Sequence, residues 1–320
     1  MPILEQARLK DFAYYGTGGT CAVLYAPADV AELAGYMREI QRQGKPYLLL
    51  GGGTNSLVMD EPFPGAVLLF RSLARLEVQG ERMTVGAGVE NSALAQAALA
   101  SGLDGAAWMY RLPGQIGGTV RMNARCYGGE ISQIVTRVKA VTPAGEVVDY
   151  TDPSMFRGYK DTVFMSNGHL VAEVQVTLRP GDARLIGERM AFCEKDREGK
   201  GQFAWPSCGC VFKNDYTVGV PSGLLLETAG AKSLHQAGAV VSPYHANFVY
   251  NQGATSRDIL ELTLRMRELV YEAFGVWMEY EMEILGHVPE DLAWRIAERK
   301  TARFDELALK PLRERMTARR

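Results

Sequence analysis

The sequence has no apolar run long enough to cross a bilayer, and its few cysteines form no recognisable framework. Only five of the 320 residues are cysteines, an odd number scattered along the chain, which excludes a small disulfide-stapled secreted scaffold. The first twelve residues carry Glu5, Lys10 and Asp11 and lack the apolar segment of a secretory signal. We therefore expect a cytoplasmic protein that makes no use of a membrane.

A strong charge of either sign is also missing. The formal net charge is -2, so the chain has no global positive field to hold a polyanion, and we expect no nucleic-acid partner. Hydrophobic residues make up 47% and charged residues 22%, which is the balance of an ordinary globular protein. A chain of this length is expected to form two or three compact units. Its oligomeric state is not fixed by the sequence.

The first third of the chain alternates strand and helix patterns. A helix is expected to open at Asp29, because Val30, Leu33, Met37 and Ile40 follow at helical spacing. The apolar or alternating runs predict strands at residues 21–25, 47–50, 66–70 and 83–87, with a helix at 92–99.

Later segments predict further units. The residues Pro143-Ala-Gly145 predict the turn of a hairpin, and residues 170–178 alternate like a half-buried strand. A charge-dense stretch at 188–200 follows a turn and is taken as a unit boundary. Thr255 and Asp258 predict a capping box that opens an amphipathic helix. The tail from Pro289 is expected to be helical, basic and solvated or docked, with Leu292, Ile296 and Leu307 as packing residues.

Two glycine-rich loops suggest an extended ligand that carries a pyrophosphate. Gly51-Gly-Gly-Thr-Asn-Ser56 follows a buried strand, and a second stretch runs from Pro113 to Asn123. Glycines let the backbone approach a ligand closely and point successive N–H groups at a phosphate. The first loop has neither the Walker A nor the G-x-G-x-x-G pattern, so a tight turn without a ligand remains an alternative for it. For the second stretch the alternative is a glycine-rich crossover between sheet strands.

A third segment, Pro206-Ser-Cys-Gly-Cys-Val-Phe-Lys-Asn214, places two thiols near a cation and an amide. Gly209 predicts a turn that presents the thiol of Cys210, while Lys213 and Asn214 suit contacts to phosphate or uracil. The spacing Cys208-x-Cys210 is half of a possible metal site. No second Cys/His pair follows at ligand spacing, so we expect no metal. Buried inert thiols are the plainer interpretation.

Taken in order, these segments resemble the UDP-N-acetylenolpyruvoylglucosamine reductase family. Its pattern has a GGGSN-like loop, a PGxIGGAVxMNAGAYGGE stretch, and the motifs YRxS, PSxGSxFKNP, SxxHANFxxN and LEPEVxxIG. The corresponding segments here are 51–56, 113–130, 159–162, 206–214, 242–251 and 278–286. The resemblance covers nearly all of residues 10–286, and the spacing after Lys160 is similar to the family's shorter type.

The resemblance implies an α+β fold with an FAD-binding region of the vanillyl-alcohol-oxidase-like type. The implied parts are 1–71 and 72–187 as FAD-binding subdomains, 188–286 as a substrate-binding domain and 287–320 as a helical extension. The implied cofactors are FAD and NADPH, which reduces the flavin. The implied substrate is the enolpyruvyl ether of UDP-N-acetylglucosamine, which is reduced to UDP-N-acetylmuramate for peptidoglycan precursor synthesis.

The resemblance also assigns roles to residues of this sequence. Cys210 takes the place of the family's proton-donating serine, Glu281 that of the terminal glutamate, and Lys160 that of the arginine that braces the substrate. FAD would be held by Gly51, Gly52, Gly53, Thr54, Asn55, Ser56, Pro113, Gly114, Ile116, Gly117, Gly118 and Asn123. Substrate would be bound by Tyr159, Lys200, Gln202, Lys213, Asn214 and His245. An equal alternative for His245 is a buried histidine whose hydrogen bonds are made within the protein core. For Lys200 and Gln202 the alternative is that they lie in a solvated linker.

Several positions depart from the family pattern. Lys160 keeps the charge of the family arginine but lacks its planar two-pronged grip on a carboxylate. Arg157 is a candidate to compensate. Arg125 and Cys126 replace a Gly-Ala pair, and Asp215 replaces a proline. Two alternatives therefore stay open: a related flavin oxidoreductase with another nucleotide-linked substrate, and a non-catalytic flavoprotein that binds a nucleotide sugar.

Overall fold

The computed structural model describes residues 3–317, which form two compact units. Unit 1 comprises the described residues before Arg8 together with Cys21–Gly52 and Pro64–Arg197. Unit 2 comprises Arg8–Thr20, Gly53–Phe63 and the chain from Glu198 onward. The four-part division drawn from the sequence is finer and stays a prediction.

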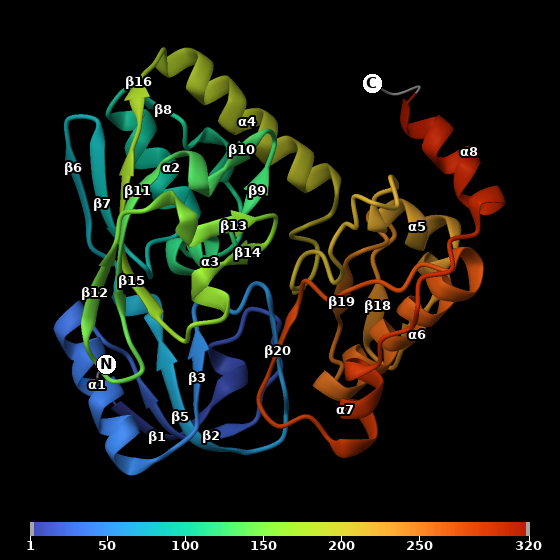
Figure 1. The fold of residues 1–320 in the computed structure, drawn as a ribbon, viewed down its shortest axis with the longest axis horizontal. Coiled ribbons are helices and arrows are strands. Elements are labelled where there is room, and N and C mark those ends of the chain that lie inside the picture. The colour runs from blue at the N-terminus through green and yellow to red at the C-terminus, as the bar shows by residue number, and fades with distance from the viewer. Residues whose placement is uncertain (1–2, 318–320) are drawn as a thin grey trace. The chain divides into compact units, whose positions relative to one another are not determined.

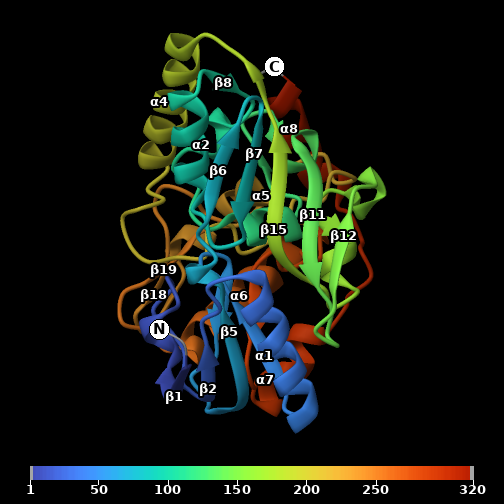
Figure 2. The same ribbon diagram turned by 90° about the vertical axis from the view of Figure 1, so that its left-hand side faces the viewer.

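Unit 1 contains two main sheets (Figure 1). The strands of the first, in spatial order, are β1 (Ile3–Arg8), β2 (Thr20–Tyr25), β5 (Phe63–Leu69) and β3 (Tyr47–Leu50). The strands of the second, again in spatial order, are β12 (Val147–Tyr150), β11 (Val135–Val141), β15 (Leu170–Thr177), β7 (Arg82–Gly86) and β6 (Leu76–Gln79). Strands β3 and β5 are parallel, whereas every neighbouring pair of the second sheet is antiparallel (Figure 2).

Smaller elements complete unit 1. Its short strand pairs are β9 (Arg125–Cys126) with β10 (Gly129–Glu130), β13 (Phe156–Gly158) with β14 (Asp161–Thr162), and β16 (Arg179–Pro180) with β8 (Leu103–Asp104). Its helices are α1 (Val30–Gln43), α2 (Asn91–Ala100), α3 (Ile116–Arg121) and most of α4 (Ala183–Gly199). The charge-dense stretch after residue 188 is thus helical, and the units change near its end, at Arg197 and Glu198.

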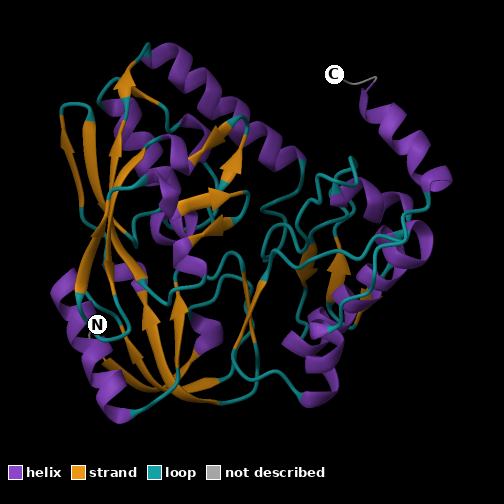
Figure 3. Cartoon of the chain, viewed as in Figure 1, coloured by secondary structure: helices purple, strands orange, loops and turns teal. Residues whose placement is uncertain are grey.

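The strands of unit 2 are all short, and its longest element is a helix (Figure 3). Its strands are β4 (Ser56–Val58), paired in parallel with β20 (Glu283–Leu285), and the sheet β17 (His235–Gln236), β18 (Ala239–Val241) and β19 (Val249–Asn251). Its helices are α5 (Ser222–Thr228), α6 (Ser256–Phe274), α7 (Glu290–Ala297) and α8 (Glu306–Thr317). Short 3-10 helices lie at Leu9–Asp11, Phe70–Ser72, Ala107–Met109, Ile131–Gln133, Pro153–Met155, Val163–Met165 and Ala231–Ser233.

Local sequence explains the two long amphipathic helices. The Asp29 carboxylate accepts a hydrogen bond from the Glu32 N–H at the start of α1, and Gly44 ends that helix at φ 62°. Thr255 and Asp258 form the predicted capping box of α6. Gly275 ends α6 at φ 66°, and a Cβ there would lie 1.8 Å from the Arg303 carbonyl oxygen, so only glycine fits.

Each unit has its own apolar core. In unit 1 the core joins α1 to both sheets through residues such as Leu33, Met37, Leu68 and Val174. In unit 2 it surrounds α6, whose Ile259, Leu262, Met266, Val270 and Phe274 are buried as their spacing predicts. Among residues 3–317, none of the helices combines the length and the apolar character needed to cross a membrane.

The tail after Pro289 forms the helices α7 and α8, which pack against the rest of unit 2. One of its three predicted packing residues needs a correction. Leu292 is buried and Ile296 is partly buried, as expected. The packing prediction for Leu307 was wrong, because this side chain is 87% exposed. Leu309 and Leu312 are buried instead, since they lie on the face of α8 that meets the core.

Candidate functional site

The first glycine-rich loop is placed by close backbone packing. Gly51 and Gly52 follow β3, and a Cβ on Gly51 would lie 3.1 Å from the Gln115 side-chain oxygen. Gly53 has φ 66°, and a Cβ there would approach the Ala13 Cα to 2.8 Å. Thr54 and Asn55 are half-buried, and the Asn55 amide donates to the Glu281 carbonyl at 3.0 Å. Ser56 opens β4 opposite Glu283.

The second glycine-rich stretch runs into helix α3, and its two glycines within that helix, Gly117 and Gly118, have different surroundings. Gly117 packs closely against Ala87, the residue after β7, because a Cβ on Gly117 would lie 2.8 Å from the Ala87 Cβ. A Cβ on Gly118 would meet nothing within 4 Å, so this glycine borders open space. Pro113 and Gly114, whose φ is 113°, lead into the loop, and Ile116 anchors it in the core.

Two buried side-chain oxygens of unit 1 have no hydrogen-bond partner within the described residues. They are the side-chain oxygens of Gln115 and Asn123. Buried polar atoms in folded proteins normally have a partner, which a ligand can supply. Together with the open space beside Gly118, these acceptors fit a bound flavin dinucleotide with its N–H and hydroxyl donors.

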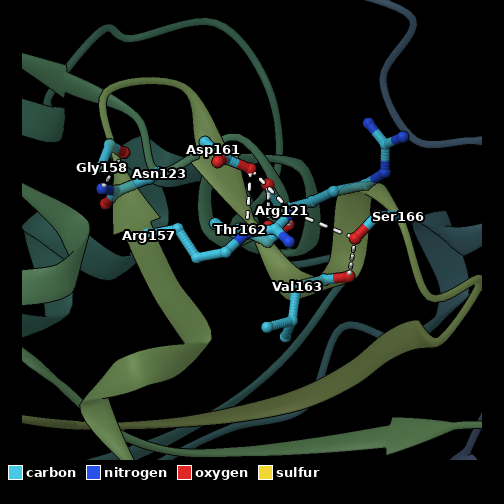
Figure 4. Close-up of polar contacts among 8 residues, drawn as sticks. All are labelled: Arg121, Asn123, Arg157, Gly158, Asp161, Thr162, Val163 and Ser166. Carbon is cyan, nitrogen blue, oxygen red and sulfur yellow. Dashed lines mark hydrogen bonds and ion pairs between the residues drawn. The ribbon is translucent and has the colours of Figure 1, made fainter.

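Asn123 also joins two hairpins of unit 1. Its amide nitrogen donates to the Gly158 carbonyl at 2.9 Å and to the Glu130 carboxylate at 2.5 Å. The Thr162 hydroxyl adds a hydrogen bond to the Arg121 carbonyl at 2.6 Å. Figure 4 shows these contacts between the loop and the second hairpin. Lys160 lies at the tip of that hairpin, with φ 53°, next to the half-buried Tyr159.

Arg157 does not supply the arginine that position 160 lacks. Its terminal nitrogen donates to the Asp161 carboxylate at 2.7 Å, the Thr162 carbonyl at 2.6 Å and the Ser166 hydroxyl at 3.1 Å. Figure 4 shows the side chain turned into this network. Its guanidinium is therefore used within the hairpin, and the idea that Arg157 compensates for Lys160 is not supported.

In unit 2, Cys210 lies on a backbone segment that is fixed on both sides. Cys210 pairs with Phe248, and the Val211 N–H donates to the Asn247 carbonyl at 2.9 Å. On the other side, the Glu281 N–H donates to the Val211 carbonyl at 2.8 Å. Cys210 and Glu281 are both half-buried. The predicted proton donor and its acidic partner thus lie on neighbouring segments.

The neighbouring thiol, Cys208, has a different environment. It is 2% exposed, and burial raises its pKa, with further contributions from Cys210 and Glu281. Tyr15, which donates its hydroxyl proton to the Val249 carbonyl at 2.9 Å, also has a raised pKa, because of burial and then Cys208. Within residues 3–317 no group of three or more His, Cys, Asp or Glu side chains could hold a metal ion.

The predicted substrate residues of unit 2 differ in their local roles. Lys213 forms an ion pair with Glu279 at 3.7 Å, and the Asn214 side chain accepts from the Ser222 N–H at 2.9 Å at the start of α5. His245 stacks on Phe248 with ring centroids 4.4 Å apart. Lys200 is exposed just after α4, and Gln202 is half-buried.

His245 is largely neutral at pH 7. Its pKa is lowered by burial first and then by the charges of Lys200 and Lys232, while Glu227 opposes the shift. Its Nδ1 accepts the Asn247 N–H at 3.3 Å, which assigns the ring proton to Nε2. A neutral ring can still donate one hydrogen bond to a ligand.

Two residues that matter for this geometry received no role from the sequence. Asn247 bonds both backbone groups of Phe212, with Oδ1 accepting at 3.0 Å and Nδ2 donating at 2.8 Å. Arg125 lies over the Tyr159 ring at 4.3 Å. The signal for the first was its place in the HANF segment, and for the second its departure from glycine.

The comparisons with known proteins match both parts of the chain. Residues 21–151 match the FAD binding domain, and residues 201–285 match the C-terminal domain of UDP-N-acetylenolpyruvoylglucosamine reductase. The chain is 31% identical over 287 residues to the protein named UDP-N-acetylenolpyruvoylglucosamine reductase in Carboxydothermus hydrogenoformans, covering 89% of this chain and 94% of the relative. It is 32% identical over 285 residues to the protein of that name in Streptococcus suis, with the same coverage of 89% and 94%.

A solved structure gives a similar result. The crystal structure of UDP-N-acetylenolpyruvylglucosamine reductase from Thermus caldophilus matches with a TM-score of 0.74 and 32% identity. The match covers 87% of this chain and 97% of that chain. The likeness therefore extends over nearly the whole of both proteins.

Proposed function

Because the chain belongs to the UDP-N-acetylenolpyruvoylglucosamine reductase family, we propose specific roles for its own residues in that family's reaction. The chain is an FAD-dependent oxidoreductase of peptidoglycan precursor synthesis, a UDP-N-acetylmuramate dehydrogenase with NADPH as reductant. The predicted α+β class is confirmed, with an FAD-binding domain of the vanillyl-alcohol-oxidase-like type and the reductase C-terminal domain.

We propose that the two glycine-rich loops hold FAD. The ligating residues would be Gly51, Gly52, Gly53, Thr54, Asn55, Ser56, Pro113, Gly114, Ile116, Gly117, Gly118 and Asn123. The support is the open space beside Gly118 and the unpaired oxygens of Gln115 and Asn123. Bound FAD supplies a group that accepts two electrons from NADPH and delivers them to the substrate.

Cys210 is the proton donor in this proposal. Reduction of the enolpyruvyl double bond requires a proton on the carbon beside the carboxylate. A thiol is protonated near neutral pH and releases its proton more readily than a hydroxyl does. The neighbouring segments fix the backbone at Cys210 on both sides, and its thiol is half-buried. Cys208 is unsuited, because burial raises its pKa.

Glu281 is the acidic partner. Its N–H is held by Val211 and its carbonyl by Asn55, so its backbone position is fixed at both ends. A carboxyl group there can orient the enol form of the substrate or exchange a proton with it. We assign it the role of steering the proton to one face of the reacting carbon.

The substrate is the enolpyruvyl ether of a UDP-sugar in this proposal. Tyr159 and Lys160 of unit 1, and Lys200, Gln202, Lys213, Asn214 and His245 of unit 2, supply the charges and hydrogen bonds that a carboxylate, a diphosphate and a uracil need. We also propose a cytoplasmic location, supported by the five scattered cysteines, and no nucleic-acid partner, supported by the net charge of -2.

The observation that carries the proposed roles is the half-buried Cys210 on a segment held by Asn247 and Glu281. The test mixes NADPH-reduced protein anaerobically with the enolpyruvyl substrate and follows flavin absorbance. We expect a yellow protein that NADPH bleaches and the substrate reoxidises. A colourless protein that takes up no FAD, or a reduced flavin that the substrate leaves unchanged, would contradict the proposal.

A further inference from the structure

Two departures from the family pattern fall on neighbouring hairpins of unit 1. Arg125, where the pattern has glycine, begins β9 of the first hairpin. Lys160, where the pattern has arginine, lies at the tip of the second, between β13 and β14. Relative to the family pattern, the second hairpin therefore lacks a guanidinium at position 160, and the first hairpin has an additional one at position 125.

The structure brings these hairpins together through a buried side chain. Asn123 is 1% exposed and donates to Glu130 of the first hairpin and to Gly158 of the second. Its backbone has φ 43°, a conformation that asparagine tolerates better than most residues. The relative position of the hairpins is thus fixed within unit 1 and does not depend on a flexible loop.

Arg125 is held against the residue that precedes Lys160. Its guanidinium carbon lies 4.3 Å from the centre of the Tyr159 ring, and a terminal nitrogen lies 4.0 Å from the Glu130 carboxylate. A guanidinium can combine stacking with hydrogen bonding, because the ring contacts its face and the hydrogen bonds lie in its plane. The Arg125 side chain is 34% exposed, so a ligand can reach it.

We propose that Arg125 is a substrate-binding residue that supplies the guanidinium lost at position 160. Arg125 and Lys160 together bind the carboxylate of the enolpyruvyl group, the arginine by paired hydrogen bonds and the lysine as a point charge. Arg157 is unsuited to the task, because Asp161, Thr162 and Ser166 occupy its guanidinium (Figure 4). This inference rests on the proposed function and identifies which residues grip the substrate.

The first experiment compares Arg125→Gln with the unchanged protein in both half-reactions. We expect the KM for the enolpyruvyl substrate to rise roughly 10- to 100-fold, the size of a lost charge-assisted pair. The rate of flavin reduction by NADPH is expected to stay within about two-fold, since Arg125 is assigned no contact with NADPH. Arg125→Lys keeps the charge and should show a smaller rise in KM.

A compensating exchange sharpens the test. Arg125→Gly with Lys160→Arg restores the family pattern at both positions, and we expect the KM of the double variant to return to within about five-fold of the unchanged protein. Arg125→Gly alone should resemble Arg125→Gln. The matched control is Arg137→Gln, which removes an exposed arginine paired with Asp149 elsewhere in unit 1 and should leave the KM unchanged.

The inference would be overturned if Arg125→Gln kept the original KM while the unchanged protein turned over normally. It would also fail if the variant lost affinity for UDP-N-acetylglucosamine, which lacks the enolpyruvyl carboxylate, as strongly as for the substrate. The proposed function fails separately, because the unchanged protein would then not be reoxidised by the substrate at all.

Discussion

The segment proposed to donate the proton, in unit 2, and the hairpin proposed to bind the substrate, in unit 1, are held in place by different kinds of contact. The Cys210 segment of unit 2 is held by backbone groups and by Asn247, which bonds both sides of Phe212. The Tyr159–Lys160 tip of unit 1 is a hairpin turn joined to its surroundings through side chains such as Asn123 and Arg125. The segment held by backbone retains a protic residue, whereas the hairpins have exchanged their charged residues. In the first segment one protic residue replaces another, whereas in the hairpins a guanidinium is present at position 125 and absent at position 160.

The largest effect is expected from a substitution of Cys210, on the segment of unit 2 that backbone contacts hold. Cys210→Ala should slow substrate-driven flavin reoxidation roughly 10²- to 10⁴-fold, the usual contribution of a general acid, and leave NADPH-driven reduction unchanged. Cys210→Ser, which restores the family residue, should retain most of the rate. Anaerobic stopped-flow measurement of the two half-reactions separates these steps.

Cys208→Ala is the matched control, because it removes a thiol of the same segment that is buried and holds its proton. We expect its reoxidation rate to stay within about ten-fold of the unchanged protein, since no proton transfer is assigned to it. A Cys210→Ala variant slowed equally in both half-reactions would remove Cys210 from the role of proton donor.

The next effect sharpens the claim that the Cys210 segment is rigid. Asn247→Ala should lower the free energy of unfolding by about 2–4 kcal/mol, because it leaves the buried N–H and carbonyl of Phe212 without partners. Urea unfolding followed by tryptophan fluorescence measures the change. The reoxidation rate should fall as well, because the lost side-chain bonds hold Phe212, two residues after Cys210 on the same segment.

Asn214→Ala is the control for Asn247→Ala, because it removes the same type of side chain where that side chain makes one hydrogen bond to the backbone instead of two. Its side chain accepts only the Ser222 N–H in the hydrogen bonds described above, so we expect a loss of about 1 kcal/mol, typical of a helix cap. Equal losses for the two variants would show that Asn247 does not brace the segment.

Much of the fold follows from local patterns, and the site follows less completely. The apolar spacing of α1 and α6 and the capping pair Thr255 and Asp258 predict these helices closely. The burial of Leu309 in place of Leu307 depends on how α8 meets the core, which periodicity in a basic tail does not determine. The pairing of Arg125 with Tyr159 joins residues from different hairpins, and no local pattern encodes it.

The smallest effect concerns pH and His245. Burial lowers the pKa of this folded-state imidazole below its unfolded value of about 6.5, so the unfolded chain binds more protons as the pH falls. The contribution of neutral His245 to stability is therefore complete above about pH 6.5 and is lost as the pH falls toward the folded-state pKa. Urea unfolding between about pH 5 and pH 8 should show this decline.

His245→Gln should flatten that decline, because glutamine does not titrate, while His235→Gln removes an exposed histidine of the same unit as a control. If the decline persists in His245→Gln, the neutral state of this ring is not what the pH changes. If it disappears, protonation of His245 is what destabilises the folded chain at low pH, and the neutral ring carries its proton on Nε2, since Nδ1 already accepts the Asn247 N–H.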